Sequence, residues 1–297
     1  MSARVKRTLV RAGSVLLMVV MAVLVYGVAI EPRLVLDERR YRAKLPELGQ
    51  QWAGTHIAVF SDLQVGMWWD NTAMVERVVD RVVDERPAAA LVAGDFLYGD
   101  SPSISQQLNT VVRLLQTLRT AGIPTFAVLG NHDYAVGGAD PLTAALRDAG
   151  VRVLHNGAAR IPAPHGTTGE PLYVVGLAPT RPGLTDIDKA LAALPADAAR
   201  VVLMHNPTAF PRLPAGTAPL ALAGHTHCGQ VAVPGLPRWS YLGLTEEEEV
   251  VADGFAPTAY GQRGNVLFVT CGIGFSLVPV RIGAAPQLVF FELAVGD

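Results

Sequence analysis

The residues TFAVLGNHD at positions 125–133 decide the fold, because an apolar strand ends there in a group of polar side chains. The strand is Thr125–Leu129, and the polar group is Gly130-Asn131-His132-Asp133. Four other apolar runs end in the same manner, at Ser61-Asp62-Leu63-Gln64, Gly94-Asp95, His205-Asn206-Pro207 and Gly224-His225-Thr226-His227-Cys228-Gly229-Gln230. Since ligands of α/β sheets bind beyond the carboxyl ends of strands, we expect the five groups to meet in one crevice.

The chain between these groups alternates between two kinds of apolar spacing. Residues 71–85 and 103–121 carry apolar side chains at helical spacing, and shorter helices are expected after Asp140-Pro141 and at about 185–194. Short apolar runs predict strands at 56–60, 88–93, 151–154, 172–177, 200–204, 218–223, 266–271, 277–282 and 287–294. Strands that alternate with helices and then dominate the end of the chain indicate an α/β domain with a mixed sheet.

The side chains of the polar groups suggest metal binding. They offer carboxylate, imidazole and amide oxygen atoms, a set that suits Mn, Fe or Zn better than a thiolate site would. A single Gly-Asp pair or a single histidine at a strand end means little by itself. Five such groups, each after an apolar strand, are hard to attribute to chance.

The order of the groups resembles the calcineurin-like metallophosphoesterase superfamily, whose pattern is D-x-H, G-D, G-N-H-D/E, a single His and G-H-x-H. The resemblance covers roughly residues 54–295 and is closest to a membrane-anchored bacterial branch, as the Glu31-Pro32 step and Gly272-Ile273-Gly274 indicate. It implies a four-layer α/β/β/α sandwich of two mixed β-sheets in residues 55–297. It also implies two divalent metal ions, most consistent with Mn, Fe or Zn, that activate a hydroxide.

The resemblance also implies a role for each matching residue. His132 would be the catalytic histidine, directed at the substrate phosphate, and Asp95 would bridge the two metals. Asp62 and His227 would bind the first metal, with Gln64 in the position of a further ligand. The second metal would be bound by Asn131, His205 and His225.

Three positions depart from the family pattern. Gln64 stands where the family usually has histidine, so the first metal would exchange an imidazole for a weaker amide oxygen. Tyr98 stands where the family often has a second aspartate that orients the catalytic histidine, and either Tyr98 or Asp133 could replace it. Thr208 stands where the branch often has aspartate.

Several residues near the motifs leave alternatives open. Cys228 is expected to be a packing residue, with a metal ligand or a disulfide to Cys271 as alternatives. Trp68 and Trp69 could line a substrate groove, lie on a membrane surface or pack in the core. We expect a structural or exposed place for the histidines outside the motifs and a solvated loop for the acidic run, which are His56, His155, His165 and Glu246–Glu249.

The amino-terminal region predicts a membrane anchor. Residues 12–30 form a run of 19 uncharged residues, which spans about 28 Å as a helix. The run is longer than the apolar part of a signal peptide and lacks a good cleavage site, although cleavage is the alternative. Residues 1–11 form a basic segment, and residues 31–54 are expected to be a juxtamembrane linker. The resemblance and the basic amino terminus favour an extracytoplasmic domain.

Charge narrows the function further. From residue 46 onward the chain has 15 basic and 23 acidic residues, a net charge of −8, which argues against nucleic acid as a partner. The leading hypothesis is a membrane-anchored phosphoesterase acting on a small-molecule or lipid-linked monoester, diester or pyrophosphate. A protein phosphate is a less favoured substrate, since no recruiting domain is evident. The alternative is a non-catalytic metal-binding or interaction module of the same fold, which Gln64 supports.

Overall fold

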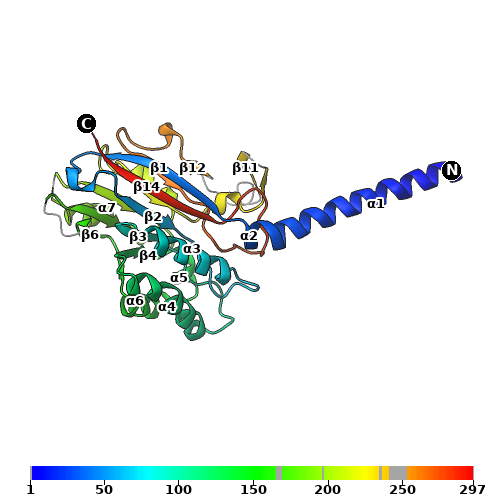
Figure 1. The fold of residues 1–297 in the computed structure, drawn as a ribbon, viewed down its shortest axis with the longest axis horizontal. Coiled ribbons are helices and arrows are strands. Elements are labelled where there is room, and N and C mark those ends of the chain that lie inside the picture. Colours follow the sequence, from blue (N-terminus) through cyan, green and yellow to red (C-terminus); the bar gives the residue numbers. More distant parts are fainter. Residues whose placement is uncertain (1, 165–168, 196, 234–235, 241–252, 297) are drawn as a thin grey trace.

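The computed structural model describes residues 2–164, 169–195, 197–233, 236–240 and 253–296. An amino-terminal helix, α1 (Ala3–Val25), projects from one end of an α/β body (Figure 1). The expectations for His165 and Glu246–Glu249 lie outside the described residues.

Two mixed six-stranded sheets are present in the described part of the chain. In the first sheet, β14 separates β1 from β2 and runs parallel to β1 and antiparallel to β2. The first sheet has the order β1 (Asp37–Leu45), β14 (Gln287–Val295), β2 (His56–Phe60), β3 (Ala89–Ala93), β4 (Thr125–Val128) and β5 (Val151–Val153). The second has the order β12 (Gly254–Phe255), β13 (Leu267–Val269), β9 (Ala221–Ala223), β8 (Arg200–Leu203), β7 (Leu172–Gly176) and β6 (Gly157–Ile161).

Three apolar interfaces stack these sheets and helices into four layers. Between the two sheets, Val59 and Leu91 of the first pack with Val201 and Leu222 of the second. The outer face of the first sheet is covered by α3 (Thr72–Glu85), α4 (Ile104–Thr120) and α6 (Ala139–Asp148), and that of the second by α7 (Ile187–Ala192) and the turn Pro207–Arg212. The expected α/β/β/α sandwich with two mixed sheets is therefore confirmed.

The long helices form where the apolar spacing predicts them. Met74, Val75, Val78 and Val79 face the first sheet from α3. α4 begins with a capping box in which the Ser103 and Gln106 side chains satisfy the first backbone amides. The short helix α5 (Asn131–Ala135) begins inside the motif that follows β4, so it fixes the directions of the motif's side chains.

The expected juxtamembrane linker at residues 31–54 is wrong. α1 continues through a π-helical turn, Tyr26–Ile30, into α2 (Glu31–Leu34), and two residues later the chain enters β1 of the first sheet. β1 pairs with β14 along its whole length, from Asp37 opposite Gln287 to Leu45 opposite Val295. The membrane-type helix and the domain are therefore joined without a free spacer.

Smaller corrections concern the strands. Residues 277–282 form no strand, because Pro279 interrupts the run and the segment instead passes beside the amino-terminal helix. β6, β12 and the hairpin of β10 (Ala232–Val233) with β11 (Leu236–Ser240) had no clear sequence signal. The remaining expected strands are present, although β9 and β13 are shorter than their apolar runs.

Within the described residues, one helical segment, Ala3–Leu34, is long and apolar enough to cross a membrane. It includes the predicted span 12–30 and extends beyond it at both ends. A signal sequence would pass the same test, so the helix alone is weak evidence of anchoring.

Candidate metal centre

The five polar groups meet at one edge of the sandwich, beyond the carboxyl ends of β2, β3, β4, β8 and β9. Asp62 and Asp95 follow β2 and β3, and each has a φ of 55°, in the left-handed region. The Asp62 N–H donates to the Gly94 carbonyl, and the Gln64 N–H donates to the Asp95 carbonyl. Left-handed non-glycine residues cluster at functional sites, and here they include Asp62, Gln64, Asp95, His225, His227, Cys228 and Gln230.

Gly94 allows the two sheets to approach at this edge. Its φ is +89°, and a Cβ there would lie 2.8 Å from Nδ1 of His205 and 2.8 Å from the backbone nitrogen of Gly130. Any side chain would push the histidine and the Gly130 turn away from Asp95. Gly94 thus permits the close approach of the two sheets, and Asp95 supplies the carboxylate.

Asp95 is the centre of the first group of ligand atoms. Ligand atoms of Asp95, His205 and His225 all lie within 4.8 Å of one another. The Asp95 carboxylate accepts hydrogen bonds from the backbone N–H of His132 (2.9 Å) and from Nε2 of Gln64 (3.0 Å). It is almost completely buried, so both contacts form away from water.

His205 leaves one nitrogen for a cation. Its Nδ1 lies 2.7 Å from the Ala93 carbonyl and donates to it in the neutral ring, so Nε2 then carries a lone pair. That Nε2 lies 3.2 Å from Oδ2 of Asp95, an ion-pair distance, yet it has no hydrogen-bond partner in the described structure. A positive charge is needed to hold Nε2 this close to a buried carboxylate, and either a proton on Nε2 or a divalent cation supplies it.

The electrostatics support the same conclusion. Burial alone would lower the pKa of His205, but the Asp95 and Asp62 carboxylates raise it to about 9, so without a metal the ring carries a proton at neutral pH, and a divalent cation would take the place of that proton. Burial alone would raise the pKa of Asp95, but His205 lowers it below the usual range. Oε1 of Gln64 is another buried polar atom without a hydrogen-bond partner among the described residues. Unpartnered nitrogen and oxygen donors around a carboxylate fit a divalent cation.

The second group surrounds Asp62. Its carboxylate accepts hydrogen bonds from the Ser61 hydroxyl and from the backbone N–H of His225, at 3.2 Å to Oδ2. Burial raises the pKa of Asp62, and a cation bound beside the carboxylate would lower it again. Nε2 of His227 lies 3.6 Å from Oδ1 of Asp62.

A buried arginine distinguishes this second group from the first. Arg281 is fully buried, and its guanidinium donates to the carbonyls of Gly274, Ala284 and Cys271. Its Nη2 also lies 3.1 Å from Nδ1 of His227. Burial lowers the pKa of Arg281 to about 10, so it stays charged near neutral pH. Because Nδ1 of His227 accepts this bond, the neutral ring carries its hydrogen on Nε2, toward Asp62, so His227 could bind a cation only after giving up one of these two contacts.

His132 stacks on Tyr98, with ring centroids 4.8 Å apart. Asp133 points elsewhere: its carboxylate accepts hydrogen bonds from the backbone N–H groups of Phe96, Leu97 and Gly130. Burial and the neighbouring Asp95 charge raise the pKa of Asp133 to about 7. Of the two residues that could orient His132, Tyr98 therefore makes the ring contact.

Asn131 lies at the edge of this centre. Its Oδ1 accepts a hydrogen bond from Nδ2 of Asn206 at 3.2 Å. A pocket of about 320 Å³ opens beside it and is lined by Asn131, Tyr134, Ala135, Arg181 and Pro182. Thr208, the third departure from the family pattern, pairs its hydroxyl with that of Thr180 at 3.0 Å.

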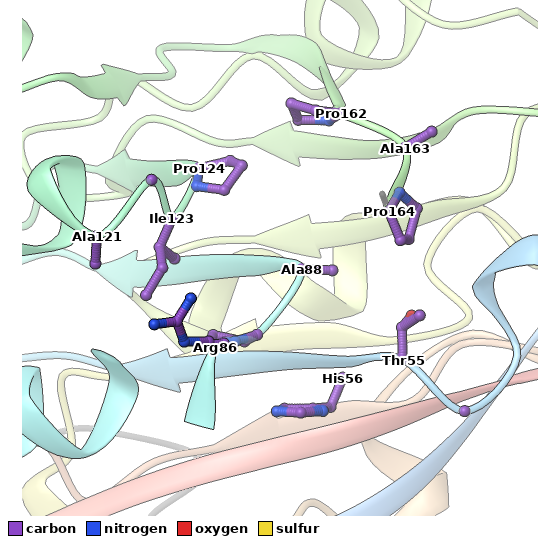
Figure 2. Close-up of a pocket in the computed structure, with 13 residues that line it drawn as sticks. Thr55, His56, Arg86, Ala88, Ala121, Ile123, Pro124, Pro162, Ala163 and Pro164 are labelled. Carbon is purple, nitrogen blue, oxygen red and sulfur yellow. The ribbon is translucent and has the colours of Figure 1, made fainter. Parts of the chain in front are cut away.

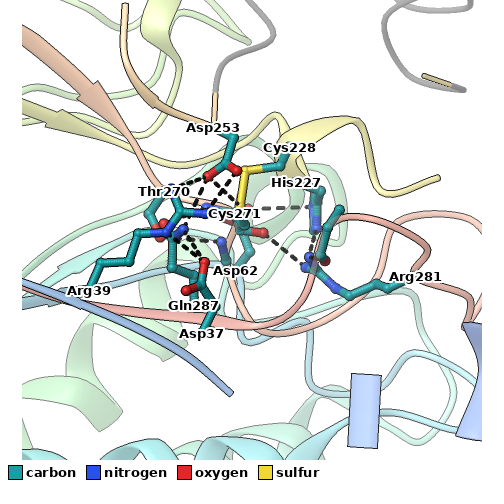
Figure 3. The surroundings of a disulfide bond; sticks show 12 residues. Asp37, Arg39, Asp62, His227, Cys228, Asp253, Thr270, Cys271, Arg281 and Gln287 are labelled. Carbon is teal, nitrogen blue, oxygen red and sulfur yellow. Dashed lines mark hydrogen bonds and ion pairs between the residues drawn. A yellow bond between two sulfur atoms is a disulfide. The ribbon is translucent and has the colours of Figure 1, made fainter. Parts of the chain in front are cut away.

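Cys228 forms a disulfide with Cys271, so the expected packing role is wrong and the disulfide alternative is correct. Figure 3 shows the bond between His227 on one side and Asp37, Arg39, Asp253 and Gln287 on the other. Asp253 lies close to both sulfurs, but sulfurs bonded to each other are not thiolate ligands. The disulfide fixes the loop that carries His225 and His227 to the segment after β13.

Sequence reasoning missed three residues of the centre. Arg281 gave a weak signal, as a single charge inside the apolar run 277–282, and Ser61 and Asn206 gave none beyond their place in the motifs. His56 is half-buried and His155 is exposed, as expected. Trp68 and Trp69 are both exposed, which excludes core packing.

A second pocket lies at the other edge of the sheet and is remote from the metal centre. It has a volume of about 480 Å³ and is bordered by His56, Ala88 and Pro124, at the amino ends of β2, β3 and β4. Figure 2 shows Arg86 and Pro162 among its walls.

Comparison with known proteins gives the same family as the motifs. Residues 55–229 match the family model described as calcineurin-like phosphoesterase. The phosphodiesterase YaeI of Escherichia coli is 31% identical over 71% of this chain and 72% of its own length. The uncharacterized metallophosphoesterase YkuE of Bacillus subtilis is 24% identical over 90% of this chain and 89% of its own length. A transmembrane protein with a metallophosphoesterase domain from Danio rerio is 24% identical over 93% of this chain and 61% of its own length.

The family model covers more than half of the chain and includes every motif that supplies the buried carboxylates and imidazoles. Family match, sandwich fold and ligand geometry agree. The chain therefore belongs to the calcineurin-like phosphoesterases and is a metallophosphoesterase, a hydrolase that acts on phosphoester bonds.

Proposed function

We propose that this protein hydrolyses a phosphodiester with two divalent cations held at the edge between its two sheets. One observation carries the proposal: the unpartnered Nε2 of His205 and Oε1 of Gln64 are buried beside the Asp95 carboxylate. The Escherichia coli relative is named a phosphodiesterase, which favours a diester over a monoester or pyrophosphate as the substrate.

The two cations are held unequally in this proposal. The second site would be formed by Asp95, Asn131, His205 and His225, and Asp95 would also serve the first site. The first site has Asp62, Gln64 and His227, and it is weaker for two reasons. Gln64 supplies a neutral oxygen, and the buried Arg281 places a positive charge 3.1 Å from His227.

The cations would lower the pKa of a bound water and polarise the phosphoryl oxygens. Asp95 and Asp62, buried and negative, keep the site attractive to cations. That water would lose a proton to solvent and its oxygen would form a bond to phosphorus; the P–O bond to the leaving group would break, and the leaving oxygen would take up a proton from the imidazolium of His132. Tyr98 holds that imidazole by stacking, and Arg181 in the pocket beside Asn131 offers positive charge to the substrate.

We further propose that residues 12–30 anchor the protein and that the domain is extracytoplasmic. The apolar helix supports the anchor. The name of the Danio rerio relative supports it as well. The Cys228–Cys271 disulfide supports the extracytoplasmic side, because disulfides persist in oxidising compartments.

The alternative is a non-catalytic module of the same fold, favoured by Gln64 and by Arg281 beside His227. Purified full-length protein, stripped of metal and then supplied with Mn, Fe or Zn, separates the two. We expect hydrolysis of bis-nitrophenyl phosphate, lost in Asp95→Ala and retained in Asp188→Ala, an exposed carboxylate on α7. Absence of hydrolysis with every metal would favour the non-catalytic module.

A further inference from the structure

The amino-terminal helix is fixed rigidly to the domain. The Gly27 carbonyl, in the π-helical turn, accepts a hydrogen bond from the Arg281 N–H at 2.8 Å. The Glu31 carboxylate accepts from the backbone N–H groups of Gly283 (3.0 Å) and Ala284 (2.7 Å). Arg33 donates to the carbonyls of Trp69 and Asp70. The direction of the helix therefore sets the direction of the domain.

The height of the domain above a bilayer follows from Gly27. The uncharged run ends at Ile30, so Gly27 lies three residues, or about 4.5 Å, inside it. A Cβ at Gly27 would lie only 2.5 Å from Cγ1 of Ile282, so the loop containing Val280 and Ile282 touches the helix at that depth. This loop must therefore lie at the boundary between the apolar core and the headgroups.

Exposed apolar side chains lie on the two segments that contact the base of the helix, the one that contains Trp69 and the loop that contains Val280. Trp68, Trp69, Leu277 and Val278, here named the apolar collar, are 63%, 57%, 49% and 40% exposed. Arg33 of α2 stacks on the Trp69 ring at 4.9 Å, which places that ring beside the helix. Tryptophan favours the membrane–water interface, and a cluster of exposed apolar side chains marks an interaction surface.

The collar borders the metal centre. The Leu277 N–H donates to the Tyr98 hydroxyl at 3.1 Å, and Tyr98 stacks on His132. Arg281 also links the helix to the metal centre. Its backbone N–H donates to the Gly27 carbonyl, and its guanidinium contacts Nδ1 of His227. Figure 1 shows α2 between this edge of the domain and α1. The edge that carries the metal ligands is thus the edge nearest the membrane.

We propose that the apolar collar is seated in the headgroup layer, so that the metal centre acts on a phosphoester carried by a lipid. The apolar chain of the substrate stays in the bilayer, and its phosphate enters the centre at headgroup height. The bilayer is the occupant of the collar because the collar is continuous with the transmembrane helix. The substrate class rests on the proposed hydrolysis, and the seating rests on the proposed membrane anchor alone.

Tryptophan fluorescence tests the seating without any catalysis. Full-length protein is placed in phosphatidylcholine nanodiscs with and without brominated acyl chains, which quench tryptophans close to them. Of the four tryptophans, Trp52 is buried in the domain and Trp239 is unchanged in the variant described next, so the difference between the two proteins reports on Trp68 and Trp69. The variant Trp68→Phe/Trp69→Phe keeps the collar apolar and should lose most of the bromine-dependent signal. Equal quenching in the wild type and this variant would overturn the seating.

Turnover tests the substrate class. Two hydrolysis rates are measured, one with hexadecyl nitrophenyl phosphate in vesicles and one with soluble bis-nitrophenyl phosphate. The readout is the ratio of the first rate to the second. We expect Trp68→Ser/Val278→Ser to lower the ratio about ten-fold or more through lost apolar contact with the bilayer. The matched control is Val266→Ser, an exposed valine before β13 at the opposite edge, which should leave the ratio unchanged.

The outcomes separate the two proposals. An unchanged ratio in the collar variant, with soluble hydrolysis intact, would mean that the substrate is not lipid-borne and would overturn this inference. If the wild type hydrolyses neither substrate, the proposed function is refuted instead. The quenching result would still decide whether the collar lies in the headgroup layer.

Discussion

Tyr98 stacks face to face on His132, with ring planes inclined by only 29°. The Tyr98 hydroxyl is itself fixed, because it accepts the Leu277 N–H. We propose that in this chain the aromatic face of Tyr98 orients the imidazole in place of a carboxylate. Stacking restricts the tilt of the imidazole but leaves both of its nitrogens available for proton transfer.

Tyr98→Leu should lower kcat by about ten- to a hundred-fold, because a displaced imidazole no longer reaches the leaving oxygen. Tyr98→Phe keeps the stacking face and should retain most of the turnover. Steady-state kinetics with metal analysis check this expectation. Equal losses in both variants would show that the hydroxyl, and not the ring, is what matters.

His132→Asn should lower turnover by about 10²–10⁴-fold, the usual contribution of general acid–base catalysis. Metal content should remain at the wild-type level, since only the backbone N–H of His132 contacts Asp95 in the described structure. Metal that disappears together with activity would identify His132 as a ligand.

Gln64→His should tighten the first metal site and reduce the need for added Mn. The Gln64 amide donates to Asp95 while its oxygen lies buried without a partner in the described chain, so this side chain already faces the centre. Titration of metal into the stripped protein should give one tight and one weak site in the wild type. Two equally tight wild-type sites would contradict the asymmetry.

Replacing both cysteines by serine should destabilise the domain by about 4 kcal/mol, from the closure entropy of a loop whose ends are 43 residues apart. The variant should also bind the first metal more weakly, because His227 adjoins Cys228. Denaturant unfolding of wild type and variant, each with saturating metal, measures the first effect. The Ser276→Ala variant serves as a matched surface control. An unchanged midpoint would show that the bond adds no stability.

Full-length protein should remain in the membrane fraction after carbonate extraction. The run 12–30 is uncharged, and its Gly27 carbonyl accepts the backbone N–H of Arg281, a contact with the domain that cleavage near residue 30 would remove. A soluble mature form that begins near residue 30 would refute the anchor.

The candidate ligands were predictable because each directly follows an apolar strand, and the carboxyl ends of parallel strands meet at one edge. Asp62, Asp95 and His205 therefore come together as the motifs indicate. β1 was not predictable, because its sequence DERRYRAKL is charged on both faces and becomes a strand only through β14. Arg281 was missed for a similar reason, since its carbonyl partners Cys271, Gly274 and Ala284 lie in irregular segments on either side of it.

The pairing of β14 between β1 and β2 has a consequence for the order in which a nascent chain folds. Asp37 pairs with Gln287, 250 residues later, so β1 and β2 emerge first and have no partner between them. Closing so large a loop is slow, and until it closes two strand edges stay open to mispairing. β14 therefore completes the first sheet. β1 can pair beside the core, and fix the chain that follows the helix, only after β14 has been added. If synthesis stops before residue 287, the first sheet lacks β14, and β1 and β2 keep unpaired edges. We expect such a chain to be degraded by quality-control proteases.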